Sequence, residues 1–353
     1  LLAATAPENG VSDPARQTLR EAAATRVAEA DPDAARDIAE GNVEEGFAAL
    51  KARAAAEAVN AAQAWNDIGA LAFDREQKTA LEAYREVVRL TPQDSVAWSY
   101  ISTLEVRHTG DIDAALKAAQ MGLETADNSM QRAGALDVLG DAQLLLDDVD
   151  AAAETYAESV ALSRSLLSLN PDSRKLQRDL VVGLARLGAV KMELGEIDAA
   201  MEIFQEGLKG SRKLLAGAPD DLKARRDVSY DLGGVGDAAL AMDDVITARA
   251  AFEESLEITK GLLKDDPDQI EVRRDLPHFL GKLAETELVS GNEAAAKALY
   301  LDGLEAAKSL VEDFPDNMNA HRDLLVGYAN LGDATGEATY WREARDVYRD
   351  MEA

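Results

Sequence analysis

Small and aromatic positions return along the second half of the chain at a constant interval of 48 residues. One small column stands at Gly188, Gly236, Ala284 and Gly332, and a second stands at Ala200, Ala248, Ala296 and Ala344. An aromatic column lies four residues after the second small column, at Phe204, Phe252, Tyr300 and Tyr348. Because residues four apart share one face of a helix, the last two columns predict a helix that packs through a small and an aromatic side chain.

Polar residues mark the limits of the predicted helices at the same interval. Pro-Asp pairs stand at Pro171-Asp172, Pro219-Asp220, Pro267-Asp268 and Pro315-Asp316. Proline suits the first helical position and Asp complements the positive end of a helix, so each pair predicts a helix start. Turn residues then divide each unit into two helices, at Gly195-Glu196, Met242-Asp243-Asp244 and Gly291-Asn292. We expect helices of about 18 to 21 residues, or roughly 27–32 Å.

A charged column predicts ion pairs between neighbouring units. It consists of Arg178-Asp179, Arg226-Asp227, Arg274-Asp275 and Arg322-Asp323. We expect the Arg of one unit to reach the Asp of the next in a ladder of exposed pairs, each worth roughly 0–1 kcal/mol.

A two-helix unit of this size cannot bury its apolar face alone, so neighbouring units must stack. The sequence therefore predicts an all-α solenoid.

The spacing from Gly188 to Ala200 to Phe204 resembles the tetratricopeptide repeat (TPR), here lengthened from 34 to about 48 residues. Shorter units precede it, marked by Trp65, Gly69, Ala80, Tyr84 and Pro92, by Trp98, Ser102, Ala114 and Ala118, and by Gly140, Ala152 and Tyr156. In the second of these units, Ala118 replaces the usual aromatic residue. The resemblance covers residues 62–353 and implies a right-handed α-solenoid of TPR-like hairpins.

The repeat pattern divides the chain into four regions. We expect a flexible N-terminus at residues 1–13 and N-terminal helices at 14–61, which include a degenerate hairpin in one interpretation. Three TPR-like repeats follow at 62–170, and four expanded 48-residue repeats occupy 171–353, the last of them shortened. The segment Leu1 to Ala6 is consistent with a signal-peptide remnant or with a trimmed start. We expect a cytoplasmic protein, with a periplasmic location as the alternative if the remnant is genuine.

Composition excludes several classes of function. The formal net charge of −29 repels phosphate backbones, so we expect no nucleic-acid partner. The chain has no Cys and three scattered His, which gives no reason to expect a metal, a cofactor or a catalytic residue. We expect the acidic segments Asp147-Asp148-Val149-Asp150 and Asp111-Ile112-Asp113 to supply turn and N-cap residues rather than calcium ligands. No apolar stretch is long enough for a transmembrane helix, so we expect no membrane insertion.

The resemblance implies that the first helices of the hairpins line a concave groove. The residues expected to face it are Asn66, Phe73, Asp137, Asp141, Leu144, Met192, Asp237, Leu240, Glu285, Leu288 and Asp333. The Lys/Asn/Arg set with which chaperone-binding TPR domains hold a C-terminal carboxylate is absent. A surface that mixes acidic and apolar side chains favours a basic or amphipathic peptide segment. In the alternative interpretation, these acids only keep the protein soluble.

Three functions remain after these exclusions. The first is a non-catalytic scaffold that binds a protein or peptide in the groove. The second follows from the likeness to long TPR-type repeats of bacterial signalling proteins, which accompany a separate effector domain. It is a regulatory arm of a signalling or defence protein, with its effector upstream of Leu1. The third, an enzyme, would need two groove carboxylates close together with shifted pKa values. Trp341 is a candidate contact residue for self-association through the C-terminal hairpin.

Overall fold

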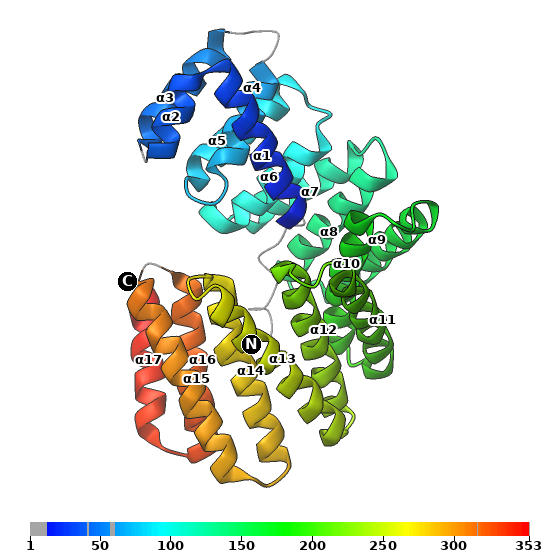
Figure 1. Ribbon diagram of the computed structural model, residues 1–353, viewed down its shortest axis with the longest axis vertical. Coiled ribbons are helices and arrows are strands. Elements are labelled where there is room, and N and C mark those ends of the chain that lie inside the picture. The colour runs from blue at the N-terminus through cyan, green and yellow to red at the C-terminus, as the bar shows by residue number, and fades with distance from the viewer. Residues whose placement is uncertain (1–12, 41, 57–60, 316, 353) are drawn as a thin grey trace. The chain divides into compact units, whose positions relative to one another are not determined.

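The computed structural model describes residues 13–40, 42–56, 61–315 and 317–352, and all regular structure in these ranges is helical (Figure 1). Seventeen α-helices and one π-helical turn follow one another through the described residues. The predicted flexible N-terminus lies outside these ranges except for Asp13, and so does the Asp316 of the last Pro-Asp pair. The prediction of an all-α fold is confirmed.

Two compact units divide the chain, Leu1–Val190 and Lys191–Ala353, with the boundary inside helix α10. The helices that begin in the first unit are α1 (Asp13–Ala30), α2 (Pro32–Glu40), α3 (Val43–Ala56), α4 (Ala61–Ala72), α5 (Gln77–Leu90), α6 (Ser95–Leu104), the π-helical turn (Glu105–Thr109), α7 (Ile112–Glu124), α8 (Ser129–Leu145), α9 (Val149–Leu169) and α10 (Arg174–Glu193). Helices α2 and α3 pack on each other, and α1 and α3 both pack on α4. Pairs α4–α5, α6–α7 and α8–α9 then form successive hairpins.

The second unit continues the same hairpin order with longer helices. They are α11 (Ile197–Ala216), α12 (Leu222–Ala241), α13 (Val245–Asp265), α14 (Ile270–Val289), α15 (Glu293–Asp313), α16 (Met318–Thr335) and α17 (Ala338–Glu352). Helices α10 to α15 have 20 or 21 residues, as the 48-residue interval predicts. The predicted repeat boundaries remain an interpretation, because helix limits alone do not define where one repeat ends.

The predicted helix starts are wrong by about one turn. Pro219 and Asp220 lie in the turn before α12, which begins only at Leu222, and α10 and α14 likewise begin three residues after Pro171 and Pro267. The side chain of Asp221 accepts hydrogen bonds from the backbone N–H groups of Lys223 and Ala224, and Asn317 does the same at the start of α16. Asp221 and Asn317 are therefore the N-caps. The oxygen of an N-cap side chain accepts hydrogen bonds from backbone N–H groups of the first turn, which have no partner within the helix.

The turns inside the long hairpins share one left-handed residue. It recurs every 48 residues at Asp147, Gly195, Asp243 and Gly291, with φ between 59° and 78°. The residue that follows it donates its backbone N–H back to the helix, as Asp244 does to the carbonyl oxygen of Ala239 at 2.9 Å. That bond defines a Schellman-type helix end. The next helix starts at once, because the Asp148 and Asp244 side chains also cap it.

Replacing Asp147 or Asp243 by glycine is expected to stabilise the protein by about 0.5–1 kcal/mol each, since an L side chain is strained at positive φ. Urea unfolding followed by circular dichroism measures the change. The matched control is Gly195→Asp, which introduces the same strain and is expected to destabilise by a similar amount. A loss of stability in both Asp→Gly variants would contradict the explanation.

Small and aromatic residues pack against each other inside the hairpins. A Cβ atom on Gly140 would lie 2.6 Å from the Tyr156 ring, and one on Gly236 would lie 2.6 Å from the Phe252 ring. The sequence Gly233-Gly234-Val235-Gly236 therefore serves close helix packing, because a Cβ on Gly233 would also come within 3.0 Å of Phe279.

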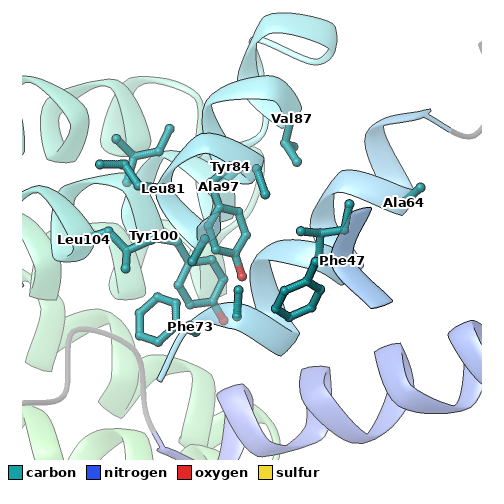
Figure 2. Packing of buried hydrophobic residues seen from close by; sticks show 14 of the residues in the cluster. Phe47, Ala64, Phe73, Leu81, Tyr84, Val87, Ala97, Tyr100 and Leu104 are labelled. Carbon is teal, nitrogen blue, oxygen red and sulfur yellow. The ribbon is translucent and has the colours of Figure 1, made fainter. Parts of the chain in front are cut away.

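The core of the first unit contains one residue predicted to line the groove. Tyr84 and Tyr100 stack with their ring centroids 4.7 Å apart, and Phe73 meets Tyr100 edge-on at 5.3 Å (Figure 2). Phe73 is only 2% exposed and belongs to this core, so its predicted contact with a partner is wrong. The aromatic cluster stabilises the hairpin by burying area and through ring contacts.

The last hairpin departs from the 48-residue register. Helix α16 ends at Gly336, which is left-handed, three residues before the position that the turn column predicts. Helix α17 therefore starts early and brings Trp341 onto Gly332, where a Cβ would lie 2.7 Å from the indole Nε1. Tyr348, in the aromatic column, is about half-exposed, whereas Ala344 stays buried.

Candidate functional site

One face of the second unit gathers three columns of side chains, one residue from each first helix. Helix α14 packs against both α12 and α16, so residues at the same register on these helices lie in rows. The columns are Tyr230, His278 and Val326; Gly234, Lys282 and Asn330; and Asp237, Glu285 and Asp333. We call these nine residues the first-helix face. Tyr230 is 47% exposed, and His278, Val326, Glu285 and Asp333 are also exposed.

A lysine in the middle of the face neutralises part of its acidity. The Lys282 ammonium lies 2.8 Å from a carboxylate oxygen of Asp237 and 3.6 Å from one of Glu285. Burial lowers the pKa of Lys282, but Asp237 and Glu285 together raise it above its usual value. Asp333 is farther along the row and is exposed. The acidic character predicted for the groove is therefore greatest at Glu285 and Asp333.

His278 stands between the charged residues of the face. Desolvation lowers its pKa, Asp237 and Asp275 act in the opposite direction, and Lys282 lowers it further. The imidazole is therefore neutral at pH 7, and its ring meets that of Phe279 edge-on at 5.1 Å. This contact gives His278 a packing role.

His321, by contrast, places its Nε2 atom 2.7 Å from the carbonyl oxygen of Pro315 in the turn before α16.

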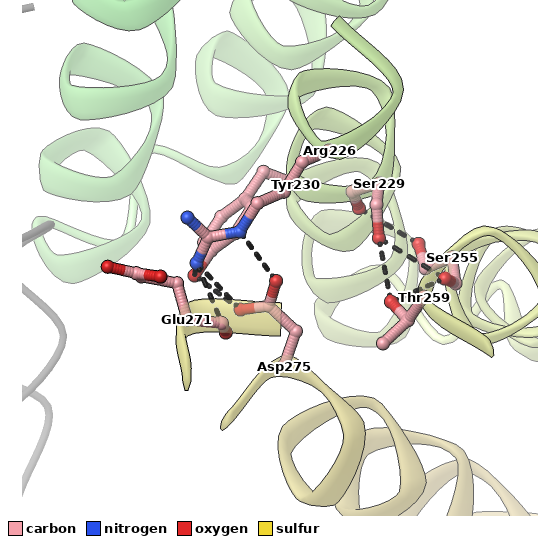
Figure 3. A network of polar contacts seen from close by, with 7 residues as sticks. All are labelled: Arg226, Ser229, Tyr230, Ser255, Thr259, Glu271 and Asp275. Carbon is pink, nitrogen blue, oxygen red and sulfur yellow. Dashed lines mark hydrogen bonds and ion pairs between the residues drawn. The ribbon is translucent and has the colours of Figure 1, made fainter. Parts of the chain in front are cut away.

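The predicted Arg-Asp ladder joins neighbouring first helices at one edge of the face (Figure 3). Arg226 Nε donates to Asp275 Oδ2 at 2.7 Å, and Arg274 Nε donates to Asp323 Oδ2 at 2.7 Å. The hydroxyl of Tyr230 donates to Asp275 Oδ1 at 2.8 Å. The ladder is confirmed at these two steps, but the expectation of exposed pairs is wrong for Asp275, which is buried. These bonds fix the Tyr230 ring so that its exposed side is presented from α12.

The Tyr230 ring is half-exposed, but its hydroxyl is bonded to Asp275 and desolvated, which raises the pKa of Tyr230, and the Asp275 carboxylate raises it further. Arg226 is desolvated, yet its bond to Asp275 holds its pKa above the ordinary arginine value. Both arrangements keep the ladder in a single charge state at neutral pH. Behind it, buried Ser229, Ser255 and Thr259 exchange hydrogen bonds between α12 and α13 (Figure 3), for example from Ser255 Oγ to the Ser229 carbonyl oxygen at 3.0 Å.

The first unit uses the same arrangement in a buried form. Arg186, which is 5% exposed, lies between Asp137 and Asp141. Its Nε is 3.1 Å from Asp141 Oδ1, and its Nη1 is 3.7 Å from Asp137 Oδ2. Tyr156 donates to Asp141 Oδ1 and Ser159 donates to Asp137 Oδ1, each at 2.6 Å. The two acids predicted to face a partner are therefore engaged inside the protein.

Burial dominates the titration of this cluster. It raises the pKa of Asp137 to about 6, although Arg186 and the Ser159 hydroxyl act in the opposite direction. Burial also raises the pKa of Asp141, against the opposing effects of Arg186 and Tyr156. Asp137 and Asp141 are two neighbouring carboxylates with raised pKa values, which is the arrangement that a catalytic site would need. Their arginine partner and hydroxyl donors give them a structural explanation instead.

The cations missed by the sequence analysis follow a simple spacing. Arg186 pairs with Asp141, and Lys282 pairs with Asp237, and each cation lies 45 residues after its acid. In a 48-residue repeat, the position that matches the acid on the next first helix lies 48 residues later. The cation therefore stands three residues, or just under one helical turn, before that position. A search for opposite charges at an offset of 45 would have found both pairs.

The remaining predicted groove residues are half-buried. Met192 packs beside the cluster around Phe204, Leu240 beside that around Phe252, and Leu288 beside that around Tyr300. Asn66 and Leu144 are also half-buried, and no contact recorded for them supports or contradicts a binding role. Trp341 is 45% exposed, although one side of its ring covers Gly332.

The described residues contain no group of three or more His, Asp or Glu side chains arranged to hold a metal ion. Within the same ranges, no helix combines the length and the apolar character needed to cross a bilayer.

The hairpin order and the small-aromatic packing make this chain a TPR-like helical repeat protein. Among solved structures, it is similar to BtubC (BKLC) from P. vanneervenii, at 16% identity and a TM-score of 0.52 over 66% of this chain and 89% of BtubC. It is similar to the apo form of RapI, at 12% identity and a TM-score of 0.56 over 96% of this chain and 85% of RapI. A Rap protein complexed with competence and sporulation factor matches at 12% identity and a TM-score of 0.57, over 96% and 88% of the two chains.

These likenesses concern the fold alone, since all three identities are low. No protein-family model and no curated protein sequence matches the chain.

Proposed function

We propose that the protein is a non-catalytic scaffold that binds a protein or peptide segment on the first-helix face of its second unit. The observation that carries the proposal is the set of exposed side chains at matching registers on α12, α14 and α16. Tyr230 and Val326 offer apolar contact area, and Glu285 and Asp333 offer charge. An aromatic side chain already fixed by a hydrogen bond loses little entropy when a partner covers it.

A basic amphipathic segment fits this face best. Glu285 and Asp333 attract Lys or Arg side chains, and Tyr230 and Val326 accept an apolar stripe. Lys282 pairs closely with Asp237 and more loosely with Glu285, so it offsets part of the Glu285 charge, but its ion pairs do not include Asp333. The Rap protein complexed with competence and sporulation factor has a similar fold, which supports a binding role for helical hairpins of this kind.

Binding of a fluorescein-labelled 18-residue amphipathic Lys/Leu peptide, measured by anisotropy at 0.15 M salt, tests the proposal. The double variant Glu285→Lys/Asp333→Lys is expected to weaken binding at least about tenfold, because two favourable charges become repulsive. Tyr230→Ala is expected to weaken binding as well, through lost contact area.

The matched control is Glu305→Lys/Glu312→Lys, which changes the net charge equally at exposed positions of α15. It is expected to bind like the wild type, and a scrambled peptide of the same composition is expected to bind more weakly. Equal losses in the two double variants would show that net charge alone drives binding and would reject the site.

Three further predictions from the sequence, on a regulatory arm, on location and on self-association, are compatible with the proposed scaffold. A regulatory arm with an upstream effector is compatible with the same face, and so is a cytoplasmic or a periplasmic location. Self-association through the C-terminal hairpin is supported by the exposed half of Trp341. Light scattering of the wild type and Trp341→Ala would separate self-association from partner binding.

A further inference from the structure

A second surface feature lies in the first unit. Helices α5 and α7 are the second helices of consecutive hairpins, and α6 packs against both of them (Figure 1). A pocket with a volume of about 480 Å³ opens between them. Trp98 and Ile101 of α6, Val88 of α5, and Ala118 and Met121 of α7 supply its apolar lining.

Ala118 is the residue that replaces the aromatic of the TPR pattern. The corresponding residues of the flanking hairpins, Tyr84 and Tyr156, are large and fully buried. Ala118 is also buried, but it contributes only a methyl group to the pocket wall. Trp98 is held in place because its Nε1 donates to the carbonyl oxygen of Pro92 at 2.8 Å. The largest side chain of the apolar lining is therefore held in one orientation.

Cations stand on both sides of this lining. Arg85 and Arg89 project from α5, and Lys117 projects from α7. All three are exposed, in a chain whose net charge is −29. The Debye length at 0.15 M salt is about 8 Å, so a ligand in the pocket interacts mainly with the local charges. These are the three cations, Glu86, which pairs with Arg89 at 2.7 Å, and Glu105, which pairs with Arg85.

A buried carboxylate positions one of the cations. Arg85 Nη2 donates to Glu105 Oε1 at 2.6 Å, and Glu105 is buried at the edge of the pocket. The hydroxyl of Thr109 donates to Glu105 Oε2 at 3.0 Å. Both residues belong to the π-helical turn, an uncommon element that is frequent at functional sites. An arginine has five N–H groups, so Arg85 retains donors for a ligand while Glu105 holds it.

We propose that this pocket binds an acidic peptide segment of a partner protein, in which a large apolar side chain is flanked by carboxylates. The apolar side chain enters between Ile101 and Met121. Carboxylates on its two sides then reach Arg89 on α5 and Lys117 on α7. Cations on opposite walls of the pocket match a ligand that carries an anionic group on each side of an apolar side chain. A small molecule with a single carboxylate has only one such group. This site is independent of the proposed function and has the opposite charge preference.

Anisotropy of the fluorescein-labelled peptide GSDELFDEGS, added to the full chain at 0.15 M salt, tests the inference. The wild type is expected to bind it, and Arg89→Glu/Lys117→Glu is expected to weaken binding at least about tenfold. Both positions are exposed, so the variant should fold, which circular dichroism verifies. A peptide with Ser-Ser in place of Leu-Phe is expected to bind at least about tenfold more weakly, since the pocket then has no apolar occupant.

Two matched variants separate this site from other surfaces. Arg75→Glu/Lys78→Glu makes the same charge change at exposed positions outside the pocket, and it is expected to bind like the wild type. Glu285→Lys/Asp333→Lys is expected to leave the affinity for this peptide unchanged. Absence of binding to the wild type, or equal loss in the two charge-reversal variants, overturns the inference. Binding of decanoate in place of the peptide also overturns it, because the pocket would then be a site for small carboxylates.

Discussion

Replacing Arg186 by methionine is expected to lower the free energy of unfolding by about 3–5 kcal/mol at pH 7. The side chain is buried between Asp137 and Asp141, and its removal leaves two partly buried carboxylates without their cation. Methionine fills a similar volume, so the loss arises from charge rather than from a cavity. Urea unfolding followed by circular dichroism measures it.

The pH dependence of this loss distinguishes its cause. Burial already raises the pKa of Asp137 to about 6, and removing the arginine raises it further. An acid whose pKa is raised by folding favours the native state most when it is protonated, so the defect should shrink as the pH falls from 7 to 5. The control Arg132→Met breaks an exposed pair with Glu158 and should cost little at either pH. A defect that is equal at both pH values would indicate lost packing instead.

Replacing Asp231 by asparagine is expected to stabilise the second unit, and more so as the pH rises. Asp231 is 1% exposed on α12, where its Oδ1 would be 3.0 Å from a Cβ placed on Gly207. Burial raises its pKa to about 8, the Ser211 hydroxyl opposes the shift, and the nearby Asp227 adds to it. The carboxyl group is therefore mostly protonated in the folded protein at pH 7.

The sign of the effect follows from the two states of the carboxyl group. The unfolded chain ionises near pH 4 and the folded chain only near pH 8, so the native state binds the extra proton between these values. The stabilisation that the protonated Asp231 carboxyl group contributes is fully present below pH 4 and is lost as the pH rises to about 8. The total is roughly 5 kcal/mol at 1.4 kcal/mol per pH unit. Asparagine does not titrate and avoids the loss.

Unfolding curves of the wild type and Asp231→Asn at pH 5, 7 and 8.5 test this expectation. The difference between the two proteins should grow across the series. Asp220→Asn, at an exposed position in the turn before α12, should show no such growth. A variant that is less stable than the wild type at pH 8.5 would mean that the ionised carboxylate makes a bond that the amide cannot replace.

The sequence was informative wherever a feature repeats at fixed spacing. Helix lengths, hairpin turns and the bond from Arg226 to Asp275 all follow from the 48-residue interval, because stacking brings equal registers together. The N-caps were missed by a few residues, since a proline before a helix fits either the first turn or the preceding loop. The early start of α17 was missed as well, because Gly336 breaks the register locally.

The candidate sites depend on offsets that the interval does not give. Arg186 reaches Asp141 from 45 residues away, so a comparison at 48 residues does not align the two charges. Phe73 was misassigned because α4 ends at Ala72, so Phe73 lies in the turn after the helix, where it packs into the core beside Tyr100. The pocket beside Ala118 was not predicted. Ala118 in the aromatic column indicates that a ring is missing there, but the sequence does not indicate which helices surround the resulting space.

The ion pairs of the second unit bear on how it unfolds. Arg226 with Asp275, Arg274 with Asp323, and Lys282 with Asp237 each connect one hairpin to the next rather than the two helices of one hairpin. In a nearest-neighbour description, their free energy belongs to the coupling between repeats and not to any single repeat. Strong coupling makes an isolated open hairpin rare, so the hairpins of this unit should exchange their amide hydrogens together instead of fraying one by one.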